Sequence, residues 1–335
     1  MYEQYFGLRK NPFVMAPDPA FLFLTAAHRE ALAGLTYAVL SRKGFLVLTG
    51  EAGTGKTTLL STILHSIPAS RANFSLVLNP MLTPAEFLEL ALLDFGIPEV
   101  PVSKAQRLML LQQYLVEAHR QGKVSVLIVD EAHKLGPDLL EEIRLLTNFE
   151  TAEGKLLQIV LAGQSELNAL LARQDLRQLK QRIAVRLAIR PLTPAEVEHY
   201  LRHRWARAGA SADLPFRAEA IEGITRWSQG IPRVVNAICD NALLLAYGAG
   251  VSSIGAEQIR EAAQDLDLLN GGAPTAAAST ARVEVAELRV PTPASALVAP
   301  GPIRVPPPKL PRQVKPSLLA RWAGKLGLVA ATNKI

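Results

Sequence analysis

The chain has 335 residues, 49% of them apolar and 20% charged, and a formal net charge of +6. These values suit one large globular domain or two modest ones and exclude a wholly disordered chain. They also exclude a disulfide scaffold, because Cys239 is the single cysteine.

Apolar runs alternate with helical segments over residues 1–190, which is typical of a parallel sheet covered on both faces. The expected strands cover residues 45–49, 74–79, 124–130, 156–162 and 183–190. The expected helices cover residues 27–42, 55–66, 84–95, 104–121 and 137–149. The sequence therefore predicts an α/β domain over residues 1–190, with residues 1–25 as its N-terminal lead-in.

A small all-helical domain is expected over residues 191–268, where no strand-like run remains. Its helices should cover residues 194–209, 217–228, 232–247 and 255–267.

The positive charge of the chain lies in the proline-rich segment 269–335, whose net charge is +7, so that the rest carries −1. We expect this tail to be disordered, because it cannot bury a core. Residues 317–331 fit either a disordered apolar end or a short helix that could dock on a membrane surface or a partner. The sequence shows no secretory leader and no apolar run long enough to span a membrane. We therefore expect a cytoplasmic protein that could contact the inner membrane peripherally.

A phosphate-binding loop follows the first expected strand and opens a helix, the context that supports such a motif. Its residues match the pattern G-x-x-x-x-G-K-[ST]. Backbone N–H groups of such a loop point at a phosphate, the lysine reaches the β- and γ-phosphates, and the hydroxyl binds Mg²⁺. The predicted ATP-binding set is Gly50, Glu51, Ala52, Gly53, Thr54, Gly55, Lys56, Thr57 and Thr58.

Two carboxylates, Asp130 and Glu131, end the third strand, where ligands bind in open α/β sheets. We expect Asp130 to join Thr57 in holding Mg²⁺ and Glu131 to act as the base for the attacking water. An acidic pair after a strand can also simply begin a helix. With His133 the segment also mimics a helicase signature, but no later helicase motif is recognisable.

Polar side chains end two further strands. Gln164 could contact the γ-phosphate or the attacking water, and Asn79 could hold Glu131 inactive. For both residues, a solvated loop position is the alternative.

Basic residues concentrate between residues 173 and 190. They could form a nucleic-acid patch, a solvated helix face, or an arginine that reaches a neighbouring subunit's γ-phosphate. Arg182 is our choice for such an arginine and Arg186 the second. In the helical domain, Arg233 follows Pro232 at a helix start and could contact the γ-phosphate; otherwise it is a surface arginine.

Taken together, these motifs resemble the AAA+ ATPases, and in particular the general secretion pathway protein A (ExeA-like) family. The resemblance covers about residues 1–267 and implies a P-loop α/β domain followed by a helical lid. It implies Gln164 as sensor 1, Arg182 as the arginine finger and Arg233 as sensor 2, in homo-oligomers with nucleotide at subunit interfaces. The motifs that carry it are Tyr5–Leu8, Asn11–Phe13, Pro17–Pro19, Gly50–Thr58, Leu127–His133, Gly163–Leu167, Leu179–Arg182 and Gly230–Asn236.

The sequence thus leaves two functions open. The first is Mg²⁺-dependent ATP hydrolysis that powers the assembly or remodelling of a cell-envelope secretion, pilus or export complex. The alternative is a DNA-associated ATPase switch of the transposition-regulator type, which the near-neutral charge of residues 1–270 disfavours. A non-hydrolysing scaffold is disfavoured, because Lys56, Asp130 and Glu131 are all present.

Overall fold

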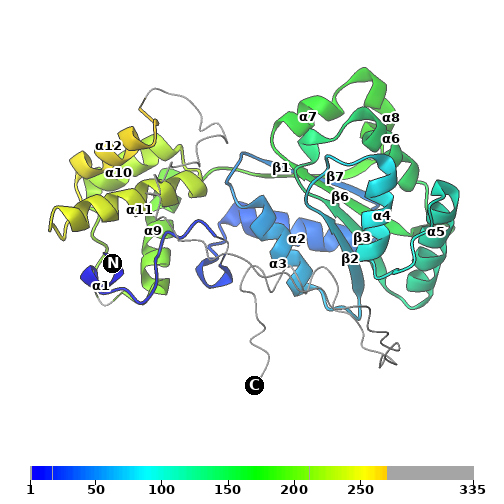
Figure 1. Cartoon of the computed structure of the whole chain (residues 1–335), viewed down its shortest axis with the longest axis horizontal. Coiled ribbons are helices and arrows are strands. Elements are labelled where there is room, and N and C mark those ends of the chain that lie inside the picture. Colours follow the sequence, from blue (N-terminus) through cyan, green and yellow to red (C-terminus); the bar gives the residue numbers. More distant parts are fainter. Residues whose placement is uncertain (1, 17, 211, 270–335) are drawn as a thin grey trace, which may run out of the picture.

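The computed structural model describes residues 2–16, 18–210 and 212–269. The expected disordered tail, its short helix at 317–331 and its membrane contact fall outside these residues. Figure 1 shows two lobes, an α/β lobe that contains the sheet and a helical lobe beside it. None of the helices within the described ranges is long and apolar enough to span a bilayer.

Five parallel strands form the central sheet, as the sequence predicted, in the order β2-β3-β6-β1-β7. Because all five run the same way, their carboxyl ends meet at one edge, where the predicted site residues gather. The strands are β1 (Phe45–Gly50), β2 (Ala72–Val77), β3 (Val124–Val129), β6 (Leu157–Gly163) and β7 (Ile183–Ile189).

Helices cover both faces of the sheet, because successive apolar side chains of each inner strand point to opposite sides. In β1, Leu46 and Leu48 pack with α2 (Ala26–Leu40) and α3 (Lys56–Ser66). Phe45 and Val47 pack into the opposite core. That second core contains α4 (Pro84–Asp94), α5 (Lys104–Arg120), α6 (Pro137–Leu146), α7 (Glu166–Leu171) and α8 (Arg177–Gln181).

Several short elements were not predicted, because one turn of helix or two strand residues leave no periodic pattern. They include α7 and α8, the hairpin β4 (Glu150–Thr151) and β5 (Gly154–Lys155), and the 3₁₀ turns η1 (Pro19–Phe21), η2 (Ala132–Lys134) and η3 (Gln174–Leu176).

The helical domain begins at a capping box, in which the Thr193 side chain accepts from the Glu196 backbone and the Glu196 carboxylate accepts from the Thr193 N–H. Its four helices surround a core that includes Ile224, Ile238 and Ile259. They are α9 (Pro194–Arg207), α10 (Ala218–Ser228), α11 (Pro232–Gly248) and α12 (Ala256–Asp265).

The N-terminal segment differs from the prediction that residues 1–25 lead into the α/β domain. The short helix α1 (Tyr2–Tyr5) lies against α11, and Phe6 and Phe13 are buried in the core of the helical domain. Tyr2 and Asn11 both donate to the Asp240 carboxylate of α11. The aromatic side chains of the N-terminal segment pack against apolar residues of the helical domain. This segment therefore belongs structurally to the helical domain, up to the start of α2.

Candidate functional site

The predicted phosphate loop leaves β1 at Gly50 and enters α3 at Lys56. Its backbone is left-handed at Gly53 (φ 81°) and Gly55 (φ 98°), a conformation that favours glycine. At Gly50 a Cβ atom would lie 2.8 Å from the Ile189 carbonyl oxygen. The three glycines therefore permit a tight turn whose N–H groups precede a helix N-terminus, an arrangement suited to phosphate.

Lys56 is buried at the start of α3, with 5% of its surface exposed. Its Nζ donates to the carbonyl oxygens of Gly50 at 2.8 Å and Glu51 at 3.0 Å. Burial lowers the pKa of Lys56, while nearby carboxylates, Asp130 foremost, oppose that shift. Since both hydrogen-bond acceptors are neutral carbonyls, the ammonium charge can serve an anionic ligand.

Thr57 and Asp130 meet although they are far apart in the sequence. Thr57 Oγ1 donates to Asp130 Oδ2 at 2.7 Å, and Asp130 Oδ1 accepts from the Glu131 N–H at 2.9 Å. A hydroxyl and a carboxylate are hard oxygen ligands that fit Mg²⁺, which proteins commonly hold with few side chains plus substrate phosphates.

Glu131 follows β3 in a left-handed conformation (φ 53°) and lines the same cavity as the phosphate loop. Its Oε2 lies 3.1 Å from Lys134 Nζ and 3.6 Å from His133 Nε2. A non-glycine residue in this conformation carries backbone strain, which clusters at functional sites.

Gln164 follows β6 and also lines the cavity. Its backbone N–H donates to His133 Nδ1 at 3.3 Å. Next to it, Ser165 Oγ donates to Glu51 Oε1 at 3.0 Å, which ties this strand end to the phosphate loop.

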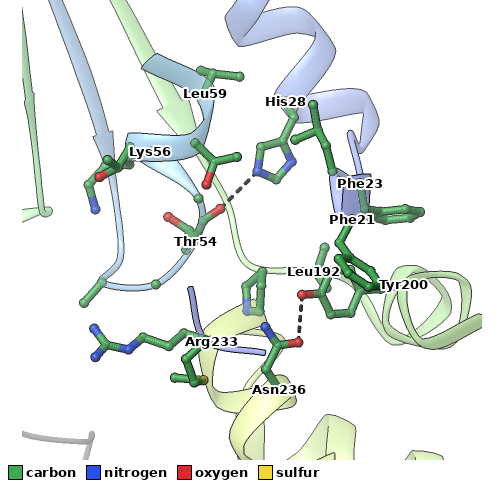
Figure 2. A pocket seen from close by; sticks show the side chains of 18 of the residues that line it. Phe21, Phe23, His28, Thr54, Lys56, Leu59, Leu192, Tyr200, Arg233 and Asn236 are labelled. Carbon is green, nitrogen blue, oxygen red and sulfur yellow. Dashed lines mark hydrogen bonds between the residues drawn. The ribbon is translucent and has the colours of Figure 1, made fainter. Parts of the chain in front are cut away.

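The helical domain contacts the phosphate loop through Arg233. The Arg233 N–H donates to the Gly53 carbonyl at 3.3 Å, and a Cβ on Gly53 would lie 2.6 Å from the Arg233 Cβ. In Figure 2 the Arg233 side chain extends from α11 beneath the loop. Gly53 is thus required both for the turn and for this close approach.

A cavity of about 630 Å³ joins the two domains, and the predicted site residues described so far line it, except Gly50, Glu51 and Asp130. Figure 2 shows the phosphate loop and Arg233 at one end and aromatic side chains, Phe21, Phe23 and Tyr200, at the other. Tyr200 donates to Asn236 Oδ1 at 2.8 Å. A polar, cationic end and an aromatic end match the phosphates and the base of a nucleotide, and the volume lies in the range of small-ligand sites.

Sequence reasoning missed His28, which is buried at the start of α2. Its Nε2 contacts the Thr54 carbonyl at 3.0 Å and its Nδ1 contacts Thr25 Oγ1 at 2.7 Å. Because Thr54 offers a carbonyl acceptor, Nε2 carries the proton, and the Thr25 hydroxyl donates to Nδ1. The position of Thr25 fits a helix N-cap, but no spacing in the sequence relates His28 to the phosphate loop.

Arg204 was also missed. It lies buried at the aromatic end of the cavity, 4.8 Å from the Phe21 ring centroid, and donates to Tyr200 Oη at 3.0 Å and to the Val14 carbonyl at 3.3 Å. It thereby ties the N-terminal segment to α9.

Besides Gly50, Glu51 and Asp130, three further predicted residues do not line the cavity. Arg182 donates to the Arg144 carbonyl at 3.3 Å and to the side chains of Thr147 and Asn148 beyond α6. Arg186, on the edge strand β7, contacts Asn168 Oδ1 at 3.4 Å. Asn79 accepts from the Met81 N–H at 3.1 Å, and the Glu131 carboxylate pairs with Lys134.

Comparison with known proteins identifies related sequences over most of the body. Residues 39–171 match the model of the AAA domain. General secretion pathway protein A of Aeromonas hydrophila is 42% identical over 255 residues, which are 76% of this chain and 46% of that protein. The chain thus spans about half the length of that relative. The ATP-dependent target DNA activator B of phage Mu is 24% identical over 75% of each chain.

Solved structures agree on the fold. The ORC2 protein of Aeropyrum pernix aligns with a TM-score of 0.57 at 18% identity, over 76% of this chain and 71% of that one. Cdc6p of Pyrobaculum aerophilum aligns with a TM-score of 0.58 at 18% identity, over 75% and 72%.

Proposed function

Because the body of this chain belongs to the AAA+ ATPases of the type found in general secretion pathway protein A, we propose that it binds and hydrolyses ATP to drive work on a cell-envelope complex. The observation that carries the proposal is the hydrogen bond of 2.7 Å between Thr57 and Asp130. It joins the phosphate loop to the strand end that bears Glu131, so the groups needed for phosphoryl transfer to water meet at one sheet edge.

The phosphate loop would bind the nucleotide's phosphates through its backbone N–H groups, with Lys56 supplying a positive charge. Thr57 and Asp130 would hold Mg²⁺, which supplies charge neutralisation for the phosphates when bound. At the other end, the aromatic residues of the cavity would enclose the base. The location of these residues along a single cavity supports this orientation.

Glu131 would accept a proton from the attacking water, and Gln164 would orient that water or the γ-phosphate. Arg233 would add a lid-borne charge near the phosphates, since it extends beneath the loop. Glu131 would first have to exchange its ion pair with Lys134 for contact with water.

Arg182 would act in trans on the site of a neighbouring subunit in a homo-oligomer. Its position supports this role, because it lies away from its own cavity and is held half-buried by the residues that follow α6. Arg186 is the second candidate.

The ATPase would act from the cytoplasm, peripherally at the inner membrane, on the assembly or remodelling of a cell-envelope secretion, pilus or export complex. The similarity to general secretion pathway protein A supports this proposal. The basic tail, residues 269–335, would meet any acidic membrane surface or partner first.

A DNA-associated ATPase switch is the second candidate, favoured by the match to the phage Mu target DNA activator over 75% of each chain. Salt-dependent DNA binding by residues 1–270 would support it, whereas binding that requires the basic tail would not.

Two substitutions test the ATPase proposal. Lys56→Ala should abolish binding of a fluorescent ATP analogue, because the phosphates lose their buried cation. Glu131→Gln should bind the analogue normally but hydrolyse ATP about 10²-fold more slowly or worse, because the water loses its base. Lys43→Ala, at an exposed lysine outside the cavity, is the control for both. Hydrolysis by Glu131→Gln at the unsubstituted rate would refute the assignment of the base.

A further inference from the structure

His133 lies between the two polar residues that end β3 and β6. Its Nδ1 is 3.3 Å from the Gln164 backbone nitrogen, and its Nε2 is 3.3 Å from the Gln164 side-chain amide. The same Nε2 lies 3.6 Å from Glu131 Oε2. The His133 side chain is 11% exposed and does not line the cavity, whereas Glu131 and Gln164 do. His133 thus lies next to both residues without lining the cavity itself.

The backbone holds this imidazole close to the end of β6. A Cβ on Gly163 would lie 3.1 Å from the His133 backbone nitrogen and 3.4 Å from its Nδ1. A side chain at Gly163 would crowd the η2 turn, and the close approach brings the Gln164 N–H onto Nδ1.

The hydrogen-bond pattern fixes where the proton of His133 sits. Because Nδ1 accepts from the Gln164 N–H, a neutral imidazole carries its proton on Nε2. An Nε2–H donor cannot pair with the Gln164 Nε2 that lies 3.3 Å away, so we assign the Gln164 amide with its Oε1 in that position. The NH₂ group of Gln164 is then turned away from His133 and left to donate to a ligand oxygen.

We propose that His133 is a positioning residue for hydrolysis, which orients the Gln164 amide and keeps the Glu131 carboxylate beside it. This inference rests on the proposed function, since it concerns the reaction at that site. The distance of 3.6 Å between Nε2 and Glu131 Oε2 exceeds a hydrogen bond, so the imidazole N–H acts on the carboxylate as a fixed dipole. His133 would therefore link the residue near the γ-phosphate to the residue that activates water.

Two substitutions separate the imidazole's two contacts. In His133→Asn the short side-chain amide can still accept from the Gln164 N–H, but no atom of the asparagine reaches the place of the imidazole Nε2. In His133→Gln the longer amide can donate from that position. His199→Asn, at an exposed histidine of α9, is the matched control.

The measurement is kcat and KM for ATP with the full chain, together with its affinity for a fluorescent ADP analogue and its Tm. We expect His133→Asn to lower kcat about tenfold or more, because Gln164 and Glu131 are misplaced for the reaction. KM and the analogue affinity should stay within about twofold of the unsubstituted values, because the residues that bind the nucleotide are unchanged. His133→Gln should recover about a third or more of the original kcat, and His199→Asn should leave kcat unchanged.

Three outcomes with the substituted chains would overturn the inference. Unchanged kcat in His133→Asn would show that hydrolysis does not need the imidazole. A kcat in His133→Gln no higher than in His133→Asn would show that the donor at Nε2 has no part, and a fall in Tm in both would mark His133 as structural. If the unsubstituted chain bound the analogue without hydrolysing ATP, the proposed function itself would fail, and the inference with it.

Discussion

At the residue scale, Gly53 offers a test of how the helical domain contacts the phosphate loop. A Cβ at this position would lie 2.6 Å from the Arg233 Cβ, and the residue has φ 81°. Gly53→Ala should therefore push Arg233 away and weaken binding of a fluorescent ATP analogue about tenfold or more. This effect comes in addition to the backbone strain of the new alanine, which costs about 1–2 kcal/mol.

Gly96→Ala is the matched control. Gly96 has a similar φ of 89° but nothing within 4 Å of a Cβ, so it shares the strain without the collision. Equal analogue affinity in the two variants would contradict the view that the lid must approach Gly53.

Contiguous residues of the site could be predicted from the sequence, and contacts between distant residues could not. The phosphate loop is a local pattern, and Asp130 and Glu131 follow from the rule that parallel strands end at one edge. The contacts of His28 with Thr54 and of His133 with Gln164 depend on how separate segments lie in space. The roles of Gln164, Arg182 and Arg233 stay predictions.

At the element scale, strands and helices with a clear periodicity were predicted within a few residues, as for β3 and α4. The N-terminal segment was not, because its four-residue helix and scattered aromatic residues carry no period. Its place is decided by burial against the helical domain, as for Phe13, which has no exposed surface.

Phe13→Ala tests this placement. Phe13 packs edge-on against Phe216, with ring centroids 6.0 Å apart. Its truncation should lower the free energy of unfolding by about 3–5 kcal/mol, because a cavity remains in the helical core. Thermal or urea unfolding measures the loss. Leu244→Ala, at a half-exposed residue of α11, should cost about 1 kcal/mol or less, and a similar value for both variants would refute the placement.

At the scale of the whole molecule, the N-terminal segment, the phosphate loop and the start of α11 together line the cavity. Hydrophobic patterning predicts each layer but carries no information on how two domains are oriented. That arrangement also leaves Arg182 outside its own cavity, hydrogen-bonded to the residues that follow α6. A site built from one chain alone therefore lacks the Arg182 guanidinium, and a second copy of the chain would have to supply it.

Mixing two inactive variants tests that conclusion. Arg182→Ala should bind ATP but hydrolyse it slowly, while Lys56→Ala fails to bind ATP and keeps Arg182. In mixed oligomers, an Arg182→Ala site can receive the arginine of a Lys56→Ala neighbour, so an equal mixture should regain roughly a quarter of the original activity if subunits assort at random. Glu131→Gln mixed with Lys56→Ala is the control and should regain none, because each site needs its own base. Equal recovery in both mixtures, or none in the first, would contradict the action of Arg182 in trans, and recovery by Arg186→Ala instead would move that role to Arg186.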